Sequence, residues 1–287
     1  MWSVDVTTAK SKRLSEEAIA QYRREGYYFP IDVLDDGQVA EYRAMLETFE
    51  TAQGHPLLGP QRNKSHLLFT WVDELMRNPT ILDAVEDLIG PDILCWNTLF
   101  WIKEPRSGAF ISWHQDANYW GLDNNELVSA WVALSPASVE AGCMRILPGT
   151  HLGEPMPHSD EYDAENMLTR GQSIVEGVDE DKAITMPLKS GQISLHNVRL
   201  AHASTPNLTD DRRIGLSIHY MPPHTQQIVG DWDSAALVRG EDKFGYFAAA
   251  PRPARDLDPE AVAFHERASL AVRGILFDGA ERVRPTL

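Results

Sequence analysis

The sequence predicts a mainly β protein with flanking helices, in which the strands form an antiparallel barrel or sandwich. Two observations predict it. The first 90 residues and the tail show helical periodicity, whereas short aromatic and β-branched runs separated by turn residues fill the middle. We expect one domain over residues 1–287: a helical part over about 15–90, a barrel core over about 91–225 and a C-terminal helical extension over about 226–287.

The helices before the barrel have recognisable ends. Ser15 is an N-cap candidate for "SEEAIAQYRREGYY", and Gly26 ends that helix. "DDGQVAEYRAMLETFETAQG" predicts a second helix, and "NPTILDAVEDLIGP" predicts a third between Asn78-Pro79 and Gly90-Pro91. "DPEAVAFHERASLAVRGILFDG" predicts a closing helix, and residues 1–12 a loose arm.

The strands follow Gly90. Runs typical of strands are "DILCWNTLFWIKEP", "AFISWHQDANYW", "LVSAWVALSPA", "CMRILPG", "AITMPLKSGQISLHN" and "RRIGLSIHYMP". Residues 153–182 are acidic and irregular between two strand regions, which is typical of a lid or a substrate-facing loop.

Composition excludes several function classes. The net charge of −16 argues against a nucleic-acid partner and against an anionic membrane surface. Only two cysteines are present, Cys95 and Cys143, without a disulfide framework or a CxxC zinc pattern, and both are expected to be small buried residues. No signal peptide and no membrane span is evident, so we expect a cytoplasmic protein. The sequence leaves the oligomeric state open.

One stretch carries chemistry, "FISWHQDANYW". On a strand, His114 and Asp116 point to the same side, and a buried carboxylate beside a buried imidazole is costly unless it is paired or bound to a metal. One imidazole and one carboxylate fill two positions of the 2-His-1-carboxylate triad of non-haem iron oxygenases. A second His-x-Asp, at His158, lies in an acidic loop and is expected to be solvated surface.

The third ligand must come from the segment after Gly191, which offers four histidines: His196, His202, His219 and His224. In the strand "RRIGLSIHY", period-2 alternation places Arg213 and His219 on one face with glycine and serine between them, as expected for the wall of a site. Arg212 belongs to the other face and is expected at the surface. His202 lies on the preceding strand, and a turn at Pro206 to Asp211 brings it beside the Arg213 face.

At these residues the sequence resembles the phytanoyl-CoA dioxygenase family of Fe(II)/2-oxoglutarate-dependent oxygenases. The segments that carry the resemblance are "YRREGYYFP", "WHQD", "WVALSPASVEAGCMRILPGTH" and "GQISLHNVRLAHASTPNLTDDRR", and they span about residues 15–225. The resemblance implies a double-stranded β-helix (jelly-roll, cupin-like) barrel. It also implies Fe(2+) as cofactor with 2-oxoglutarate and O₂ as co-substrates, and hydroxylation of an unactivated C–H bond with release of succinate and CO₂.

The resemblance also implies roles for residues. His114, Asp116 and His202 would be the iron ligands, because they match the family's motif by position. Arg213 would bind the distal carboxylate of 2-oxoglutarate. Further candidates are Ser204 and Asn97 for 2-oxoglutarate, and Trp120, His219 and Trp131 for the substrate pocket. Because Asp116 is present, the resemblance implies oxygenation rather than the halogenation of relatives that have Ala or Gly there.

The remaining candidates are expected to be structural. His196 is expected to hydrogen-bond within its strand, and His151 to tie a loop through its ring nitrogens. Trp113 and Trp131 are expected to be core, with packing around the cofactor as the alternative.

Several alternatives stay open. The same iron centre supports desaturation, cyclisation or epimerisation, because these outcomes depend on how the substrate is placed. A metal-binding cupin-like protein without turnover and a zinc hydrolase would also use histidine and carboxylate ligands, but neither needs Arg213. The sequence shows no basic patch for a CoA ester, and it fits a neutral or cationic small molecule.

Overall fold

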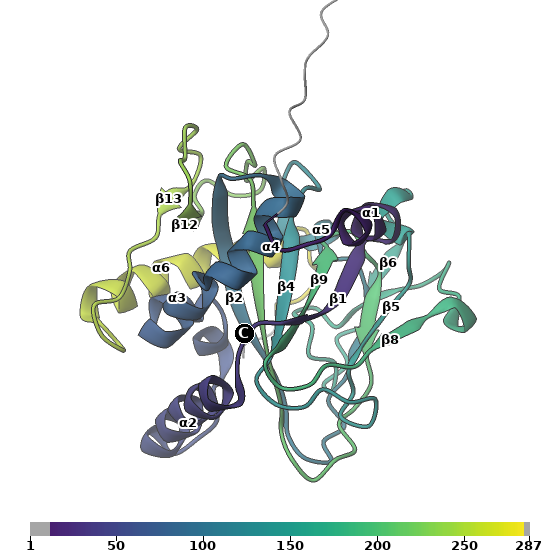
Figure 1. The fold of residues 1–287 in the computed structure, drawn as a ribbon, viewed down its shortest axis with the longest axis horizontal. Helices are drawn as coiled ribbons and strands as arrows, with labels where there is room; N and C mark the ends of the chain where they lie inside the picture. The colour runs from purple at the N-terminus through teal and green to yellow at the C-terminus, as the bar shows by residue number, and fades with distance from the viewer. Residues whose placement is uncertain (1–11, 284–287) are drawn as a thin grey trace, which may run out of the picture.

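The computed structural model describes residues 12–283, so the predicted arm at residues 1–12 lies almost wholly outside the described residues. Two sheets form the body of the molecule (Figure 1). The larger sheet has seven strands, in the spatial order β1 (Tyr27–Asp32), β9 (Gln192–Asn197), β4 (Val128–Ala133), β11 (Arg213–Met221), β2 (Ile93–Lys103), β12 (Ser234–Arg239) and β13 (Ala248–Ala249). All neighbours are antiparallel except β12 and β13.

The smaller sheet faces the larger one and has four strands, in the order β3 (Ile111–His114), β10 (His202–Ser204), β5 (Met144–Ile146) and β8 (Ile184–Met186). No strand pairing joins the two sheets within residues 12–283, so the jelly roll stays open at its edges. The mainly β fold with flanking helices is therefore confirmed, as two facing sheets rather than a closed barrel.

The insertion at residues 153–182 is more regular than the sequence indicates. It contains an antiparallel ribbon of β6 (His158–Asp160) and β7 (Gln172–Ile174), followed by the short helix η4 (Glu180–Lys182). Its backbone also bonds to the segment before β3, because Phe110 N–H donates to the Glu165 carbonyl at 3.0 Å.

The helices lie where the periodicity predicts them. They are α1 (Glu16–Glu25), α2 (Asp36–Gln53), α3 (Thr70–Met76), α4 (Pro79–Ile89), the four-residue α5 (Ala117–Trp120) and α6 (Pro259–Leu276), with 3-10 turns η1 (Gly59–Arg62), η2 (Ser65–Leu67) and η3 (Thr150–Leu152). The predicted caps are present: the Ser15 side chain accepts from Ala18 N–H, and Gly26 ends α1 with φ of 85°. The sequence did not predict α3, nor β12 and β13 inside the C-terminal extension.

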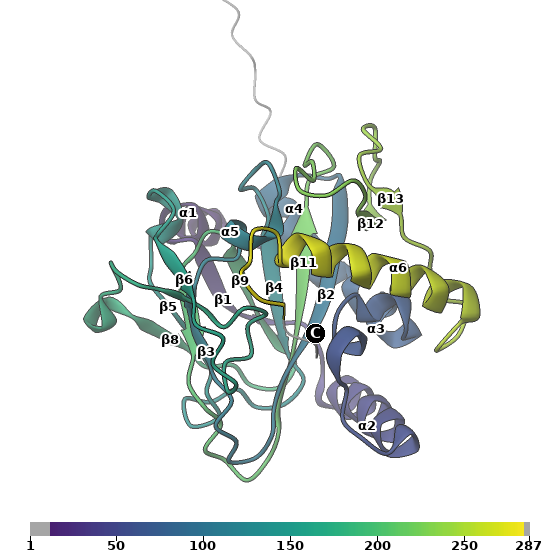
Figure 2. The same cartoon turned by 180° about the vertical axis from the view of Figure 1, so that it is seen from behind.

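Helices cover both faces of the larger sheet. α3 and α4 lie on one face (Figure 1), and α6 crosses β2 and β11 on the other (Figure 2). The alternation of side chains predicted for β11 shows which face of the sheet holds the core and which face holds the cavity. Ile214, Leu216, Ile218 and Tyr220 belong to the main core with residues of α3 and α4, whereas Arg213 and His219 point to the α6 side and line a cavity.

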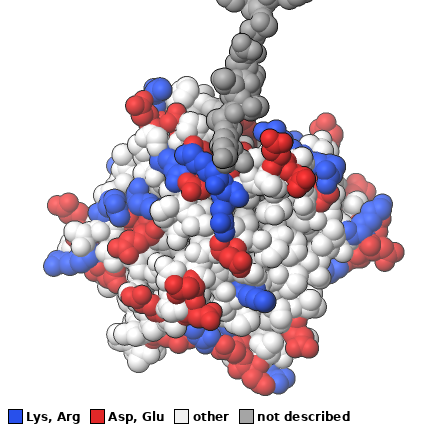
Figure 3. Space-filling model, in the orientation of Figure 1, with Lys and Arg blue, Asp and Glu red and all other residues white. Residues whose placement is uncertain are grey.

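One face of the molecule shows how its charged side chains are distributed. On the face in Figure 3, basic and acidic side chains are interspersed rather than gathered into a basic stripe. Within residues 12–283, no helix is long and apolar enough to cross a bilayer.

Candidate active site

A cavity of about 600 Å³ opens on the inner face of the larger sheet. Strands of both sheets form its inner part, and η1, the insertion and α6 form its outer part. Aromatic side chains make up much of the wall; they are Trp96, Trp101, Tyr119, Trp120, Trp131 and Phe277. This volume and lining are typical of a site for an organic ligand.

Three side chains converge in the cavity, as predicted. His114, Asp116 and His202 place one ligand atom each within 4.8 Å of one another. His114 and His202 are buried, and they lie opposite each other as register partners of β3 and β10. β3 and β10 are neighbouring strands of the smaller sheet. His114 and His202 therefore form one cluster although they lie 88 residues apart in the sequence.

The tautomers of both histidines suit metal binding. The Nδ1 of His114 lies 2.9 Å from the Ser112 carbonyl and 3.0 Å from the His202 carbonyl, and the Nδ1 of His202 lies 2.9 Å from the Leu200 carbonyl. Since a carbonyl only accepts, each Nδ1 carries the hydrogen, and each Nε2 keeps its lone pair for a metal. Burial lowers the pKa of His202 to about 4, so its ring is neutral at neutral pH.

Asp116 reaches the cluster differently from the prediction. β3 ends at His114, and Asp116 lies in the following turn with φ −61° and ψ −41°, so strand alternation does not place it beside His114. Its Oδ1 is 3.4 Å from the His114 Nε2. Burial raises the pKa of Asp116, but the neighbouring histidines outweigh burial and hold it below its usual range. A carboxylate oxygen and an imidazole lone pair that face each other at this distance call for a cation between them.

Arg213 lies at the far end of the same wall, with its side chain buried. Its Nη1 donates to the Gly142 carbonyl at 2.8 Å, and the guanidinium lies 5.3 Å from the Trp131 ring. Its Nε and Nη2 have no hydrogen-bond partner within the described part of the chain. Burial lowers the pKa of Arg213 to about 10, which leaves the group charged at neutral pH. Two unpartnered donors on a buried cation are suited to a carboxylate.

Two glycines make room for this arrangement. Gly142 has φ of 69°, and a Cβ there would lie 2.1 Å from the Thr205 carbonyl oxygen, so the turn that accepts from Arg213 requires glycine. A Cβ on Gly215 would lie 1.9 Å from the Trp131 ring. Trp131 therefore lies flat against β11 because residue 215 has no side chain. The prediction that Trp131 is buried in the core is confirmed, and one side of the ring also lines the cavity.

Ser204 also lies at the Arg213 end of the cavity. Its hydroxyl oxygen accepts from the Lys103 amine at 2.7 Å, and Lys103 also donates to the Thr205 carbonyl at 2.5 Å. Because that oxygen already accepts, its own hydrogen remains available to a ligand in the cavity. Burial, followed by the charge of Arg213, lowers the pKa of Lys103 to about 6, so Arg213 is the cation at this end at neutral pH.

Asn97 and His219 lie at the other end of the β2–β11 pair. They are register partners, whereas Arg213 pairs with Lys103, six residues further along β2. Asn97 accepts the Lys64 backbone N–H at 2.9 Å, which directs its amide nitrogen to the cavity. His219 bonds to Ser129 at 2.8 Å and packs edge-on against Trp120 at 4.4 Å. Asn97 is thus placed at the opposite end from Arg213, beside two of the substrate-pocket candidates.

Three other expectations fail in whole or in part. His196 lines the cavity behind His202, and its Nδ1 has no hydrogen-bond partner within residues 12–283, so the expected hydrogen bond at this atom is missing. Trp113 is half-buried outside the cavity: it packs at the edge of a small hydrophobic cluster of Leu147, Ile174 and Ala201 and donates to Glu180, so it is only partly core. His158 is half-buried and bonded to Gln115 N–H at 3.0 Å, so it is not solvated surface.

Other expectations hold. The His151 ring ties its loop through one of its two nitrogens: Nε2 bonds to the Arg23 carbonyl at 3.2 Å, whereas Nδ1 has no hydrogen-bond partner among the described residues. Cys95 and Cys143 are buried free thiols.

Sequence reasoning missed the outer wall. From η1, Arg62 enters the cavity, bonds to the Phe100 carbonyl at 3.0 Å and lies 6.0 Å from the Trp101 ring. From α6 and the residue after it come Glu266, Leu270, Arg273, Leu276 and Phe277. Periodicity predicted the closing helix, but no local signal shows which surface a helix covers.

Comparisons with known proteins agree with this geometry. The family model described as "Phytanoyl-CoA dioxygenase (PhyH)" matches residues 22–215. A probable alpha-ketoglutarate-dependent hypophosphite dioxygenase of Stutzerimonas stutzeri is 31% identical over 169 residues, covering 58% of each chain, so the match spans little more than half of that relative.

Solved structures add a likeness over most of the chain. The non-heme monooxygenase ThoJ has a TM-score of 0.80 and 34% identity, and the match covers 91% of this chain and 98% of that one. The epimerase SnoN, solved with Fe³⁺, alpha-ketoglutarate and a nogalamycin compound, has a TM-score of 0.61 and 26% identity, over 74% of this chain and 85% of that one.

Proposed function

The chain belongs to the phytanoyl-CoA dioxygenase family, and on that premise we propose that it is a non-haem Fe(II)- and 2-oxoglutarate-dependent dioxygenase. Its reaction would hydroxylate an unactivated C–H bond of a small molecule, with O₂ as co-substrate and succinate and CO₂ as products. His114, Asp116 and His202 would hold the iron, since both Nε2 lone pairs and the carboxylate converge on one point.

The observation that carries this proposal is the pair of unpartnered donors on Arg213. A buried guanidinium without a carboxylate partner is unfavourable in the free protein, so its retention calls for a ligand. 2-Oxoglutarate has a carboxylate at each end: one end would chelate the metal, and the other would meet Arg213 and the Ser204 hydroxyl.

The residues of the chain would bind the metal and the co-substrate, orient them and shield them from water. The carbonyls of Ser112 and Leu200 fix the imidazole tautomers, and Arg213 anchors the co-substrate at its far end. The outer wall of α6 and the insertion covers the inner cavity and limits the entry of water. The iron and the co-substrate, when bound, supply the oxidising chemistry.

The substrate would occupy the aromatic part of the cavity. Trp96, Tyr119, Trp120 and Phe277 surround that space together with Leu276. Such walls favour a largely apolar or ring-bearing organic molecule.

Two other classes fit less well. A metal carrier has no use for Arg213. A zinc hydrolase needs a general base, and within the described residues the carboxylates that line the cavity are Asp116 and the exposed Glu266 of α6. Desaturation, cyclisation and epimerisation remain alternative outcomes of the proposed centre, and the likeness to an epimerase is compatible with the last. We place the protein in a reducing cytoplasm, since both cysteines are free.

The test is succinate formation. Purified protein with Fe(II), 2-oxoglutarate and O₂ should release succinate slowly even without substrate, and His202→Ala should abolish this. Absence of succinate from well-folded protein, together with catalytic hydrolysis in the zinc-loaded form, would favour the hydrolase.

A further inference from the structure

The turn that carries Asp116 lies outside the strand ladder. β3 ends at His114, so the backbone donors of the next residues need other acceptors. Ala117 N–H donates to the Val198 carbonyl at 3.1 Å. Gln115 N–H instead donates to a side chain, the Nε2 of His158, at 3.0 Å.

The tautomer of His158 is suited to this contact. Its Nδ1 lies 2.7 Å from the Met156 carbonyl, which only accepts, so Nδ1 carries the hydrogen and Nε2 is the acceptor. The Asn118 carboxamide also lies against this nitrogen, with its Nδ2 placed 2.8 Å from Nδ1; since two donors do not bond, the protonated Nδ1 requires the amide to turn its oxygen toward the ring. The Tyr119 ring packs edge-on against His158 at 5.6 Å. The ring is thereby held on several sides.

Gln115 extends the connection to the second ligand segment. Its side chain is buried; its amide nitrogen donates to the Arg199 carbonyl at 2.6 Å, and its amide oxygen accepts Met156 N–H at 2.8 Å. Arg199 lies three residues before His202. Gln115 lies between the metal-ligand candidates His114 and Asp116. It is therefore bonded both to the insertion and to the segment that leads to His202.

The insertion also reaches the substrate end of the cavity. His158 begins β6, which pairs with β7, and Gln172 at the start of β7 lines the cavity. The cavity wall and the turn after β3 are thus joined through one short ribbon.

We propose that His158 is a positioning residue for the metal centre: by accepting Gln115 N–H, it fixes the turn that presents Asp116 beside His114. This inference rests on the proposed function, since it concerns the same three ligands. It assigns the insertion a part in building the metal site, in addition to its place in the cavity wall.

Two variants separate the hydrogen bond from packing. His158→Leu fills similar space without an acceptor, whereas His158→Gln offers an amide oxygen to Gln115 N–H. His151→Ala is the control, because His151 also ties a loop to a backbone carbonyl, that of Arg23, and it does not line the cavity. Thermal melting establishes that each variant is folded.

The measurement is Co(II) binding to the metal-free protein, followed by visible ligand-field absorption without co-substrate or substrate. We expect His158→Leu to weaken Co(II) binding about 10- to 100-fold and to alter the spectrum. His158→Gln should recover most of the affinity, and His151→Ala should match wild type.

The outcomes are distinct. Unchanged Co(II) affinity and spectrum in His158→Leu, or equal loss in the leucine and glutamine variants, would overturn the positioning role while leaving the metal site intact. Wild-type protein that binds no Co(II) at the site, judged by identity with His202→Ala, would overturn the proposed function as well.

Discussion

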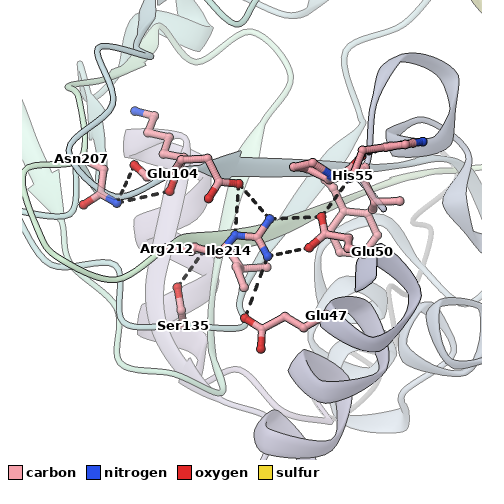
Figure 4. A network of polar contacts seen from close by, with 12 residues as sticks. Glu47, Glu50, His55, Glu104, Ser135, Asn207, Arg212 and Ile214 are labelled. Carbon is pink, nitrogen blue, oxygen red and sulfur yellow. Dashed lines mark hydrogen bonds and ion pairs between the residues drawn. The ribbon is translucent and has the colours of Figure 1, made fainter. Parts of the chain in front are cut away.

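Two adjacent arginines at the start of β11, Arg212 just before the strand and Arg213 as its first residue, have opposite surroundings. Arg212, at the outer side, bonds to Glu50 at 2.6 Å and Glu104 at 2.9 Å, with Glu47 at 3.9 Å (Figure 4). Arg213, one residue on, faces the cavity with a carbonyl, an indole ring and two nitrogens that have no partner among residues 12–283. Burial lowers the pKa of both, but the carboxylates around Arg212 outweigh this and raise its pKa.

The two arginines have different roles: Arg212 is a structural cation, and Arg213 is a ligand-binding one. Carboxylates of the protein already balance the positive charge of Arg212. This side chain therefore joins α2 to the edge of β11 and is not available to a ligand. Arg213 is buried without a balancing charge, which disfavours the free state and favours anion binding. The sequence placed the two on opposite faces correctly, but it expected Arg212 at the surface, and the structure half-buries it.

The largest expected effect comes from Arg213→Ala. Loss of a buried, charge-assisted carboxylate partner should weaken 2-oxoglutarate binding to the iron-loaded protein about 100- to 1,000-fold. Arg212→Ala should leave that affinity within about twofold, because its guanidinium faces away from the cavity. Calorimetric titration of both variants measures this, and equal losses would show that the comparison is wrong.

The second prediction concerns the loss of protein stability at acid pH that the buried histidines of the cavity cause. Burial lowers the pKa of His202 and of His219 to about 4, against about 6.5 for an unfolded histidine. Between these values the unfolded chain binds a proton that the folded chain does not, so unfolding becomes easier as pH falls. Each histidine contributes about 1.4 kcal/mol per pH unit in that window.

His219→Gln should therefore reduce the slope of unfolding free energy against pH by about one proton between pH 6 and 4.5. Denaturant unfolding of metal-free protein at several pH values gives the slope. An unchanged slope would mean that His219 titrates normally.

Substitution of Arg212 should lower the stability of the protein more than substitution of Arg213, which is the reverse of the order expected for 2-oxoglutarate affinity. Arg212→Ala leaves the buried Glu50 without its cation and should cost about 1–3 kcal/mol, seen as a melting temperature several degrees lower. Arg213→Ala removes an unbalanced charge and should lower the ligand-free melting temperature less. A larger loss for Arg213→Ala would argue that its carbonyl and ring contacts are chiefly structural.

The smallest expected effect is from Gly215→Ala. Its Cβ would displace the Trp131 ring, which packs on Arg213, and we expect about a tenfold loss of 2-oxoglutarate affinity. Gly274→Ala on α6 is the control, since a Cβ there meets nothing within 4 Å. Equal affinity in both variants would show that the position of Trp131 does not matter to the anion site.

Local patterns were sufficient to predict much of this structure. Caps at Ser15 and Gly26 fix α1, and period-2 alternation fixes which side chains of β11 face the cavity. Both follow from neighbours within a few residues, and so they can be read from one sequence.

Features that depend on distant contacts could not be predicted. Asp116 is placed by a turn held from the insertion, and His158 owes its role to Gln115, 43 residues earlier. The position of α6 over the cavity depends on tertiary packing alone. No local pattern indicated that Arg62 enters the cavity, since it comes from a turn that lies far from the strands of the site in the sequence.

The central claim is that Arg213 and the three-ligand cluster bind one co-substrate together. The most direct measurement is anaerobic addition of Fe(II) and 2-oxoglutarate to the metal-free protein, followed by visible absorption. We expect a weak metal-to-ligand charge-transfer band in wild type and Arg212→Ala, strongly diminished in Arg213→Ala and absent in His202→Ala. A band of equal strength in Arg213→Ala, or no band in wild type, would contradict it.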